Sequence, residues 1–110
     1  MQSKYRQDVV DILSEMLYGM PDVRLSKAFG YPAFKVGRRI FAFVGANGIS
    51  VKLGAARVQE LVDTNPAYKV FEVGEGVPWK GWMSIAYEDP EAYLQVMPLL
   101  QEAQENLTSE

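Results

Sequence analysis

The chain has 110 residues, 48% of them hydrophobic and 23% charged, and its formal net charge is −3. This length and composition are typical of a single globular domain, so residues 1–110 are expected to fold as one domain. Neither cysteine nor histidine is present, which excludes disulfides, thiolate nucleophiles and Cys-ligated metals and removes the commonest general base. We therefore expect a protein that is not an enzyme and that binds no metal and no cofactor.

The sequence has no apolar run near the roughly 20 residues that a membrane-spanning helix needs. Its N-terminal segment, "MQSKYRQDVVDILSEM", mixes charged residues with apolar ones and so lacks the pattern of a signal peptide. We expect a cytoplasmic protein that makes no contact with a membrane.

Charge is unevenly distributed along the chain. Residues 24–57 contain seven basic residues and no acidic one, whereas residues 81–110 contain six acidic residues and no basic one. The seven basic residues are Arg24, Lys27, Lys35, Arg38, Arg39, Lys52 and Arg57. The negative net charge argues mildly against a nucleic-acid partner, but the concentration of basic residues favours one. The second argument requires that the folded chain places these residues on one continuous face.

The first half of the chain predicts one helix followed by strands. Apolar residues at helical spacing predict a helix over residues 4–18, which the following Gly and Pro end. Residues 23–53 predict four consecutive antiparallel strands, in which the apolar period is two except in the third strand. That strand, "IFAFVG", is apolar on both faces and is expected to be a central strand buried on both sides. Gly37-Arg38 fits a two-residue turn between the second and third of these strands. Phe29, at the end of the first strand, is expected in the core.

The second half predicts two helices with extended chain between them. A helix is expected over residues 55–64, a partly extended stretch over 65–76 and a strand over 82–88. The last helix is expected to begin at Asp89-Pro90, and Pro98 should kink it or split it in two. The elements predict an α+β fold in the order α-β-β-β-β-α-β-β-α, with an antiparallel sheet of five to six strands and the helices packed on one face.

Two stretches carry a resemblance to known proteins. "KAFGYPAFKVGRRIFAFVGANGISVKL" and "GVPWKGWMSI" resemble elements of the TfoX N-terminal domain family and are similar to the related MmcQ/YjbR-like proteins. The resemblance covers roughly residues 9–103 and implies an MmcQ/YjbR-like fold. TfoX proteins regulate natural competence in bacteria and carry a second domain, so the resemblance implies a stand-alone N-terminal module linked to transcription regulation. For MmcQ/YjbR-like members it implies contact with DNA through paired hairpins, and no catalytic motif.

A basic hairpin is the first candidate site. Arg38 and Arg39 are expected at its tip, with Lys35 before them and Lys52 and Arg57 after them. Basic residues in these positions would contact phosphates, which gives affinity for nucleic acid without recognition of its nucleotide sequence. The alternative is that they only keep an exposed sheet edge soluble.

The segment around Lys80 is the second candidate. Trp79 and Trp82 flank this lysine and would stack on unpaired nucleobases or anchor a protein partner. The alternative is that Trp82 packs under a helix while Trp79 stays exposed in a loop.

The sequence thus leaves two functions open. The first is a non-enzymatic regulatory or adaptor-type binding module that contacts nucleic acid weakly through the basic hairpin. The second is a protein- or small-ligand-interaction module without nucleic-acid binding, which docks through Trp79 or associates with a second copy of itself.

Overall fold

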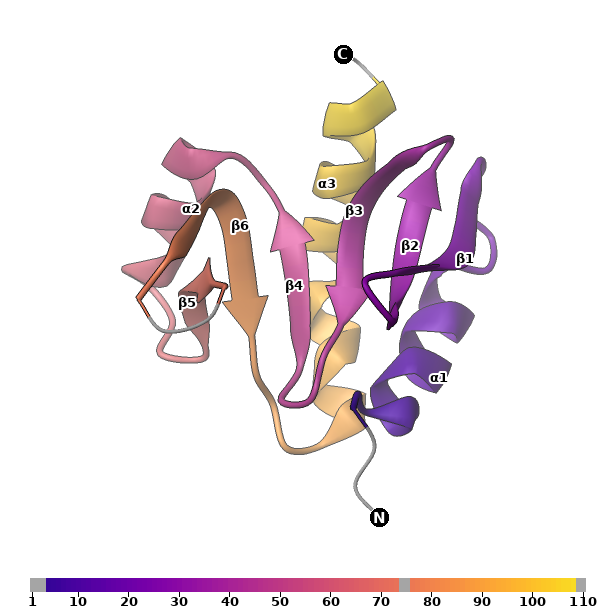
Figure 1. Ribbon diagram of the computed structural model, residues 1–110, viewed down its shortest axis with the longest axis horizontal. Helices are drawn as coiled ribbons and strands as arrows, with labels where there is room; N and C mark the ends of the chain where they lie inside the picture. Colours follow the sequence, from indigo (N-terminus) through magenta and orange to yellow (C-terminus); the bar gives the residue numbers. More distant parts are fainter. Residues whose placement is uncertain (1–3, 74–75, 109–110) are drawn as a thin grey trace.

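One antiparallel sheet and a layer of helices on one of its faces make up the fold (Figure 1). The computed structural model describes residues 4–73 and 76–108. The elements in chain order are α1 (Gln7–Leu17), β1 (Val23–Ala28), β2 (Tyr31–Val36), β3 (Arg39–Val44), β4 (Ile49–Lys52), α2 (Ala55–Val62), β5 (Tyr68–Glu72), β6 (Pro78–Ile85), the 3₁₀ helix η1 (Pro90–Val96) and α3 (Met97–Thr108). The α+β class and the predicted element order are confirmed.

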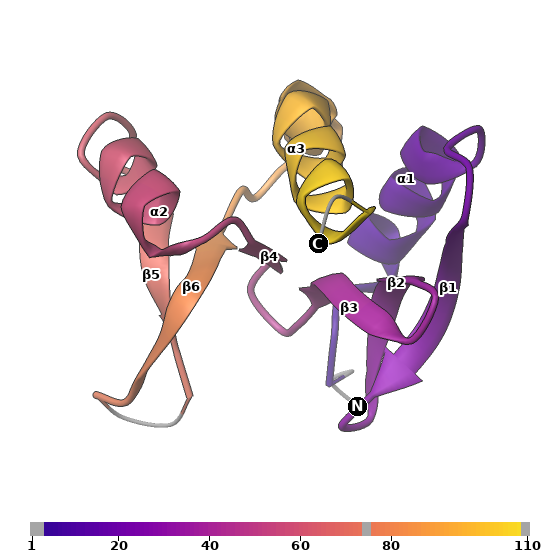
Figure 2. The same ribbon diagram turned by 90° about the horizontal axis from the view of Figure 1, so that it is seen from above.

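The six strands lie in the order β1-β2-β3-β4-β6-β5, and every neighbouring pair is antiparallel. After α2 the chain returns as the edge strand β5, and β6 then fills the place between β5 and β4. In Figure 2 the sheet twists so strongly that the β1–β2 and β5–β6 hairpins both extend away from the helices, on either side of β3 and β4. The face without helices therefore lies between two hairpins.

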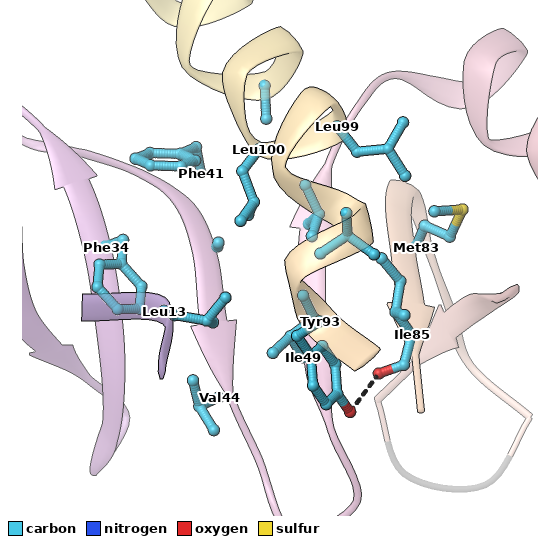
Figure 3. Close-up of a cluster of buried hydrophobic side chains, with 14 of the residues drawn as sticks. Leu13, Phe34, Phe41, Val44, Ile49, Met83, Ile85, Tyr93, Leu99 and Leu100 are labelled. Carbon is cyan, nitrogen blue, oxygen red and sulfur yellow. Dashed lines mark hydrogen bonds between the residues drawn. The ribbon is translucent and has the colours of Figure 1, made fainter. Parts of the chain in front are cut away.

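The core fills the space between the helices and the sheet (Figure 3). Helix α1 contributes Leu13 and α3 contributes Leu100, and both are fully buried. Opposite them, Ala42, Val51 and Met83 are direct cross-strand partners on β3, β4 and β6 and are also fully buried. These residues identify the helix-covered face of the sheet, because paired residues in neighbouring strands point to the same side.

A β-bulge in β3 adds one large side chain to this core. Phe34 pairs with Ala42 and Lys35 pairs with Ile40, so Phe41 is an extra residue on the β3 side of the ladder. Its side chain is 0% exposed and lies in the core near α3 (Figure 3). The bulge lets Phe41 and Ala42 both serve the helix-covered face, although they are adjacent in sequence.

The C-terminal helical region follows its local sequence signals. The Asp89 carboxylate accepts a hydrogen bond from the backbone N–H of Glu91 at 3.0 Å and caps η1, whose first residue is Pro90. The 3₁₀ helix passes into α3 at Met97, just before Pro98, so the predicted division of this helix is confirmed. Within residues 4–73 and 76–108, no helix combines the length and the apolar character needed to cross a bilayer.

Candidate functional site

The face of the sheet that carries no helices, called here the uncovered face, is identified by strand register. Phe43, Ser50 and Ser84 are direct partners on β3, β4 and β6. Their neighbours in each strand belong to the core, and successive side chains of a strand point to opposite sides. Phe43, Ser50 and Ser84 therefore form the centre of the uncovered face.

Six aromatic rings gather on this face and form what we call the aromatic cluster. Its members are Phe29, Tyr31, Phe43, Phe71, Trp79 and Trp82. Phe43 lies in the middle, with ring centroids 6.4 Å from Tyr31, 5.3 Å from Phe71 and 5.4 Å from Trp82. Trp79 lies 5.4 Å from Phe71 and 5.9 Å from Trp82. The cluster joins side chains from four strands and one turn without a helix above it.

A bulge in β6 places both tryptophans on the uncovered face. Residues three apart in a regular strand point to opposite sides. In β6, however, the register moves from Val70↔Met83 to Glu72↔Pro78, and Gly81 within this irregularity has φ of +90°. The carbonyl of Gly81 accepts hydrogen bonds from the N–H groups of residues 53 and 54, at 2.9 and 3.0 Å. The prediction that Trp82 packs under a helix is wrong, since its ring lies against Phe43.

Phe29 reaches the cluster from a strained turn. Ala28 and Tyr31 are paired, and the two residues between them, Phe29 and Gly30, have φ of +56° and +82°. Two positive φ angles are those of a type I′ turn, in which the first position favours Asn, Asp or Gly and rarely holds an aromatic residue. The side chain of Phe29 is 80% exposed. Its predicted place in the core is wrong, because the chain turns at this residue instead of extending β1.

Two hollows lie on the uncovered face and share part of their lining. The larger has a volume of about 550 Å³, and the smaller has a volume of about 360 Å³. Both are lined by Phe29, Phe43 and Trp79. Phe29 and Trp79, whose ring centroids are 6.5 Å apart, thus line both hollows.

The two hollows differ in their polar lining. The larger one is also lined by Asn47, Ser50, Ser84 and Glu72, within a mainly apolar wall. The smaller one adds Lys80 beside Trp82.

The YjbR family model matches residues 18–103, which include every residue of the aromatic cluster. The chain belongs to the YjbR family. Comparison with curated proteins gave no significant match, and neither did comparison with solved structures. The narrower resemblance to the TfoX N-terminal domain stays a prediction.

Basic residues surround the aromatic cluster of this YjbR-family protein. Lys52 pairs with Trp82 and Lys69 pairs with Ser84, so both lie on the uncovered face. The same rule places Arg24 and Lys35 there, because they pair with each other and each is adjacent to a residue that points to the helix side. Lys80 lines the smaller hollow, and the ammonium group of Lys4 lies 4.7 Å from the ring centroid of Tyr31.

Three of the predicted contact residues lie elsewhere. Arg38 occupies the β2–β3 turn, and Arg39 pairs with Val36, which packs against the core on the helix side. Arg57 belongs to α2, where its guanidinium binds Glu102 of α3 at 3.0 Å and Glu60 at 3.0 Å. The hydrogen bond that the Arg57 guanidinium donates to the Glu102 carboxylate raises the pKa of Arg57. Sequence alone suggests one basic segment, but the fold divides it between both faces of the sheet and a helix.

The uncovered face therefore keeps Lys35, Lys52, Trp79 and Lys80 of the predicted set. The predicted contact set did not include Lys4, Arg24 and Lys69 of this face. It also did not include the rings of Phe29, Tyr31, Phe43, Phe71 and Trp82. A signal for Phe29 exists in the dipeptide Phe-Gly, which fits a two-residue turn once the strands on either side are known to pair. The sequence carries no comparable signal for Phe71, whose ring partners Phe43 and Trp79 lie in β3 and β6.

Six of the chain's 14 acidic residues lie in the three α-helices of the helix layer. The helices α1, α2 and α3 carry Asp8, Asp11, Glu15, Glu60, Glu102 and Glu105. Among the described residues that line the two hollows, Glu72 is the only acid. The charge asymmetry seen along the chain thus becomes an asymmetry between an acidic helix layer and a basic, aromatic sheet face.

Proposed function

We propose that this YjbR-family protein is a non-enzymatic binding module whose uncovered face binds single-stranded nucleic acid. The observation that carries the proposal is the aromatic cluster on an uncovered sheet, with Lys52 and Lys69 on the same face and Lys80 lining the smaller hollow. Aromatic side chains stack on unpaired bases, and neighbouring ammonium groups neutralise the phosphates that connect them. Both parts of such a site are present on one surface.

A single strand suits this surface better than a duplex. The rings can stack only on bases whose flat faces are free, and in a duplex these faces are covered by neighbouring base pairs. Stacking on an aromatic side chain contributes about 1–3 kcal/mol per base, as judged by alanine substitution. The proposal moves the predicted contact from the tip of the β2–β3 hairpin, where Arg38 lies, to the face between the β1–β2 and β5–β6 hairpins.

The biological setting follows from the resemblance stated above. A module of TfoX N-terminal type would act in the cytoplasm as a regulatory or adaptor protein. Binding to unpaired nucleic acid would give such a module a direct route to a regulatory role.

One observation favours the second candidate, a small-ligand module. The larger hollow, at about 550 Å³, falls within the 300–1,000 Å³ of typical small-molecule sites, and its wall is mainly apolar. The basic residues around the cluster favour an anionic ligand, however. A strand of nucleotides uses both the aromatic rings and the basic side chains.

Fluorescence anisotropy with a labelled 20-nucleotide single strand and the matching duplex, at 50 and 200 mM salt, tests the proposal. Tighter binding of the single strand is expected. If four phosphates are contacted, the logarithm of the affinity should fall with the logarithm of salt concentration with a slope of about −2.8.

Three substitutions locate the surface. Lys52→Gln and Lys80→Gln should each weaken binding and lower the salt slope by about 0.7. Lys27→Gln is the matched control, because Lys27 pairs with the buried Pro32 and lies on the helix side of β1. Absence of binding at 50 mM salt, or an equal loss from Lys27→Gln, would overturn the proposal.

A further inference from the structure

We infer that the uncovered face binds RNA in preference to DNA, because Ser50 and Ser84 offer two hydroxyl groups to the ribose of a bound nucleotide. The inference rests on the proposed function and names the class of single strand that the site takes. Its basis is a row of four cross-strand partners in the middle of the uncovered face. The row runs Phe43–Ser50–Ser84–Lys69 across β3, β4, β6 and β5.

Strand register fixes both the side and the order of these four side chains. Val70 pairs with the core residue Met83, so its neighbour Lys69 points to the uncovered face together with its own partner, Ser84. Neighbouring strands lie about 4.8 Å apart, and each member of the row is one such step from the next. An aromatic ring, two hydroxyl groups and an ammonium group therefore follow one another across the sheet.

This order matches the three parts of a nucleotide, which are the nucleobase, the sugar and the phosphate. The ring of Phe43 lines the larger hollow together with Phe71, whose centroid lies 5.3 Å away, and these rings supply the stacking surface. Lys69 is exposed, so its ammonium group can neutralise a phosphate. A nucleotide held at both ends in this way places its sugar over the two serines.

The two serines are not explained by the needs of the sheet. Central strands favour β-branched and aromatic residues, which would fill the floor of the larger hollow and offer it no hydrogen-bonding group except in threonine. Both serines line this hollow. Ser50 is 4% exposed and is the only buried polar residue within residues 4–73 and 76–108. The pair thus keeps the floor of an aromatic hollow small and polar.

Hydroxyl groups at this position distinguish ribose from deoxyribose. The 2′-hydroxyl of RNA donates one hydrogen bond and accepts others, and a serine hydroxyl does the same, so the two groups can pair in either direction. Deoxyribose presents only C–H at this position, and serine hydroxyls covered by it lose water without gaining a partner. A site that binds a hydroxyl group therefore rejects the analogue that lacks it.

The test compares three labelled 9-mers by fluorescence anisotropy at 50 mM salt. They are oligouridylate, oligodeoxyuridylate and the 2′-fluoro form of oligouridylate, which differ only in the 2′ substituent. We expect the RNA strand to bind about tenfold more tightly than the other two, which corresponds to about 1.4 kcal/mol. Equal affinity of RNA and DNA, or RNA-like binding of the 2′-fluoro strand, would overturn the inference and leave single-strand binding intact. Failure of all three to bind would overturn the proposed function itself.

Serine-to-alanine variants assign the preference to the row. Ser84→Ala and Ser50→Ala should each weaken RNA binding about fivefold, as expected for one lost hydrogen bond, and leave DNA binding unchanged. Ser26→Ala is the matched control, because Ser26 pairs with Ala33, the partner of Phe43, and so lies on the same face, but it lines neither hollow. Equal weakening of RNA and DNA by Ser84→Ala, or an RNA-specific loss from Ser26→Ala, would overturn the assigned role of the serines.

Discussion

The ring of Phe29 in the β1–β2 turn meets the ring of Trp79 in β6 edge to face, with centroids 6.5 Å apart and planes inclined at 64°. The two residues lie in hairpins at opposite sides of the sheet order. Each reaches the contact through an unusual local conformation, a positive φ at Phe29 and a bulge containing Gly81. Since an edge-to-face pair contributes only about 0.5–1.5 kcal/mol, we connect this strained arrangement with binding more than with stability.

Replacing Phe29 by Asn should stabilise the protein and weaken ligand binding. Asn-Gly is the preferred pair for a type I′ turn, and relief of the αL strain contributes about 1 kcal/mol. The lost contact with Trp79 offsets about half of this gain, because the ring of Phe29 is 80% exposed. Urea unfolding should therefore show a free energy of unfolding about 0.5 kcal/mol higher.

Phe29→Leu is the control for this substitution. Leucine keeps the strained φ and removes the aromatic ring, so this variant should be less stable than the native protein. A result in which Phe29→Asn is the less stable of the two variants would contradict the assignment of strain to this turn.

Gly81→Ala should destabilise the protein and change the environment of both tryptophans. A φ of +90° is unfavourable for a residue with a Cβ, which costs about 1 kcal/mol or more. The nearest described atom would lie 3.5 Å from the added Cβ, so backbone strain and not crowding is the cause. Urea unfolding measures the stability, and emission from the chain's two tryptophans reports the geometry of the cluster.

Gly19→Ala provides the comparison. Gly19 follows α1, its φ is not in the left-handed region, and an added Cβ meets nothing within 4 Å. This variant should unfold at nearly the same urea concentration as the native protein. An equal effect of the two substitutions would mean that the bulge at Gly81 does not depend on glycine.

Tyr93→Phe should lower the free energy of unfolding by about 1–3 kcal/mol. The buried hydroxyl of Tyr93 accepts a hydrogen bond from the N–H of Tyr87 at 2.9 Å and donates to the carbonyl of Ile85 at 3.3 Å (Figure 3). Removing it leaves the Tyr87 N–H without this acceptor between β6 and η1. Tyr18→Phe is the control, because Tyr18 is 92% exposed and its substitution should change nothing.

Stability should fall at alkaline pH as Tyr68 ionises. Burial raises the pKa of Tyr68 to about 12, from about 10 in the unfolded chain. A group whose pKa is raised in the folded state contributes stability that is complete below pH 10 and is lost as the pH rises toward 12. Urea midpoints measured between pH 9 and 12 should decline less steeply in Tyr68→Phe. Identical slopes in both proteins would show that Tyr68 does not contribute.

The succession of helices and strands could be predicted from the sequence because its signals are local. Gly37-Arg38 forms a two-residue loop in which Gly37 has a positive φ, as predicted from the residues alone. Asp89 caps the following 3₁₀ helix, and the helical region changes character just before Pro98. Each of these signals acts within a few residues through backbone geometry, so no knowledge of distant segments is needed.

The set of residues that forms the site depends on contacts between distant segments, and no local sequence pattern predicts these contacts. Bulges turn Phe41 into the core and bring Trp79 and Trp82 to one side, and a bulge exists only relative to a neighbouring strand. The basic segment from Arg24 to Arg57 is continuous in the sequence, but strand alternation and helix α2 distribute its side chains over different surfaces.

The sequence by itself thus determined the order of elements and the excess of bases in the middle of the chain. Only the tertiary structure decided which of those basic residues lie on the same face of the sheet as the aromatic rings. The position of β6 between β4 and β5 brings Trp82 next to Phe43, although 38 residues separate them in the chain. Side-chain periodicity reports whether a residue is buried on average, whereas the partner of a side chain is set by hydrogen-bond register between strands that are distant in sequence.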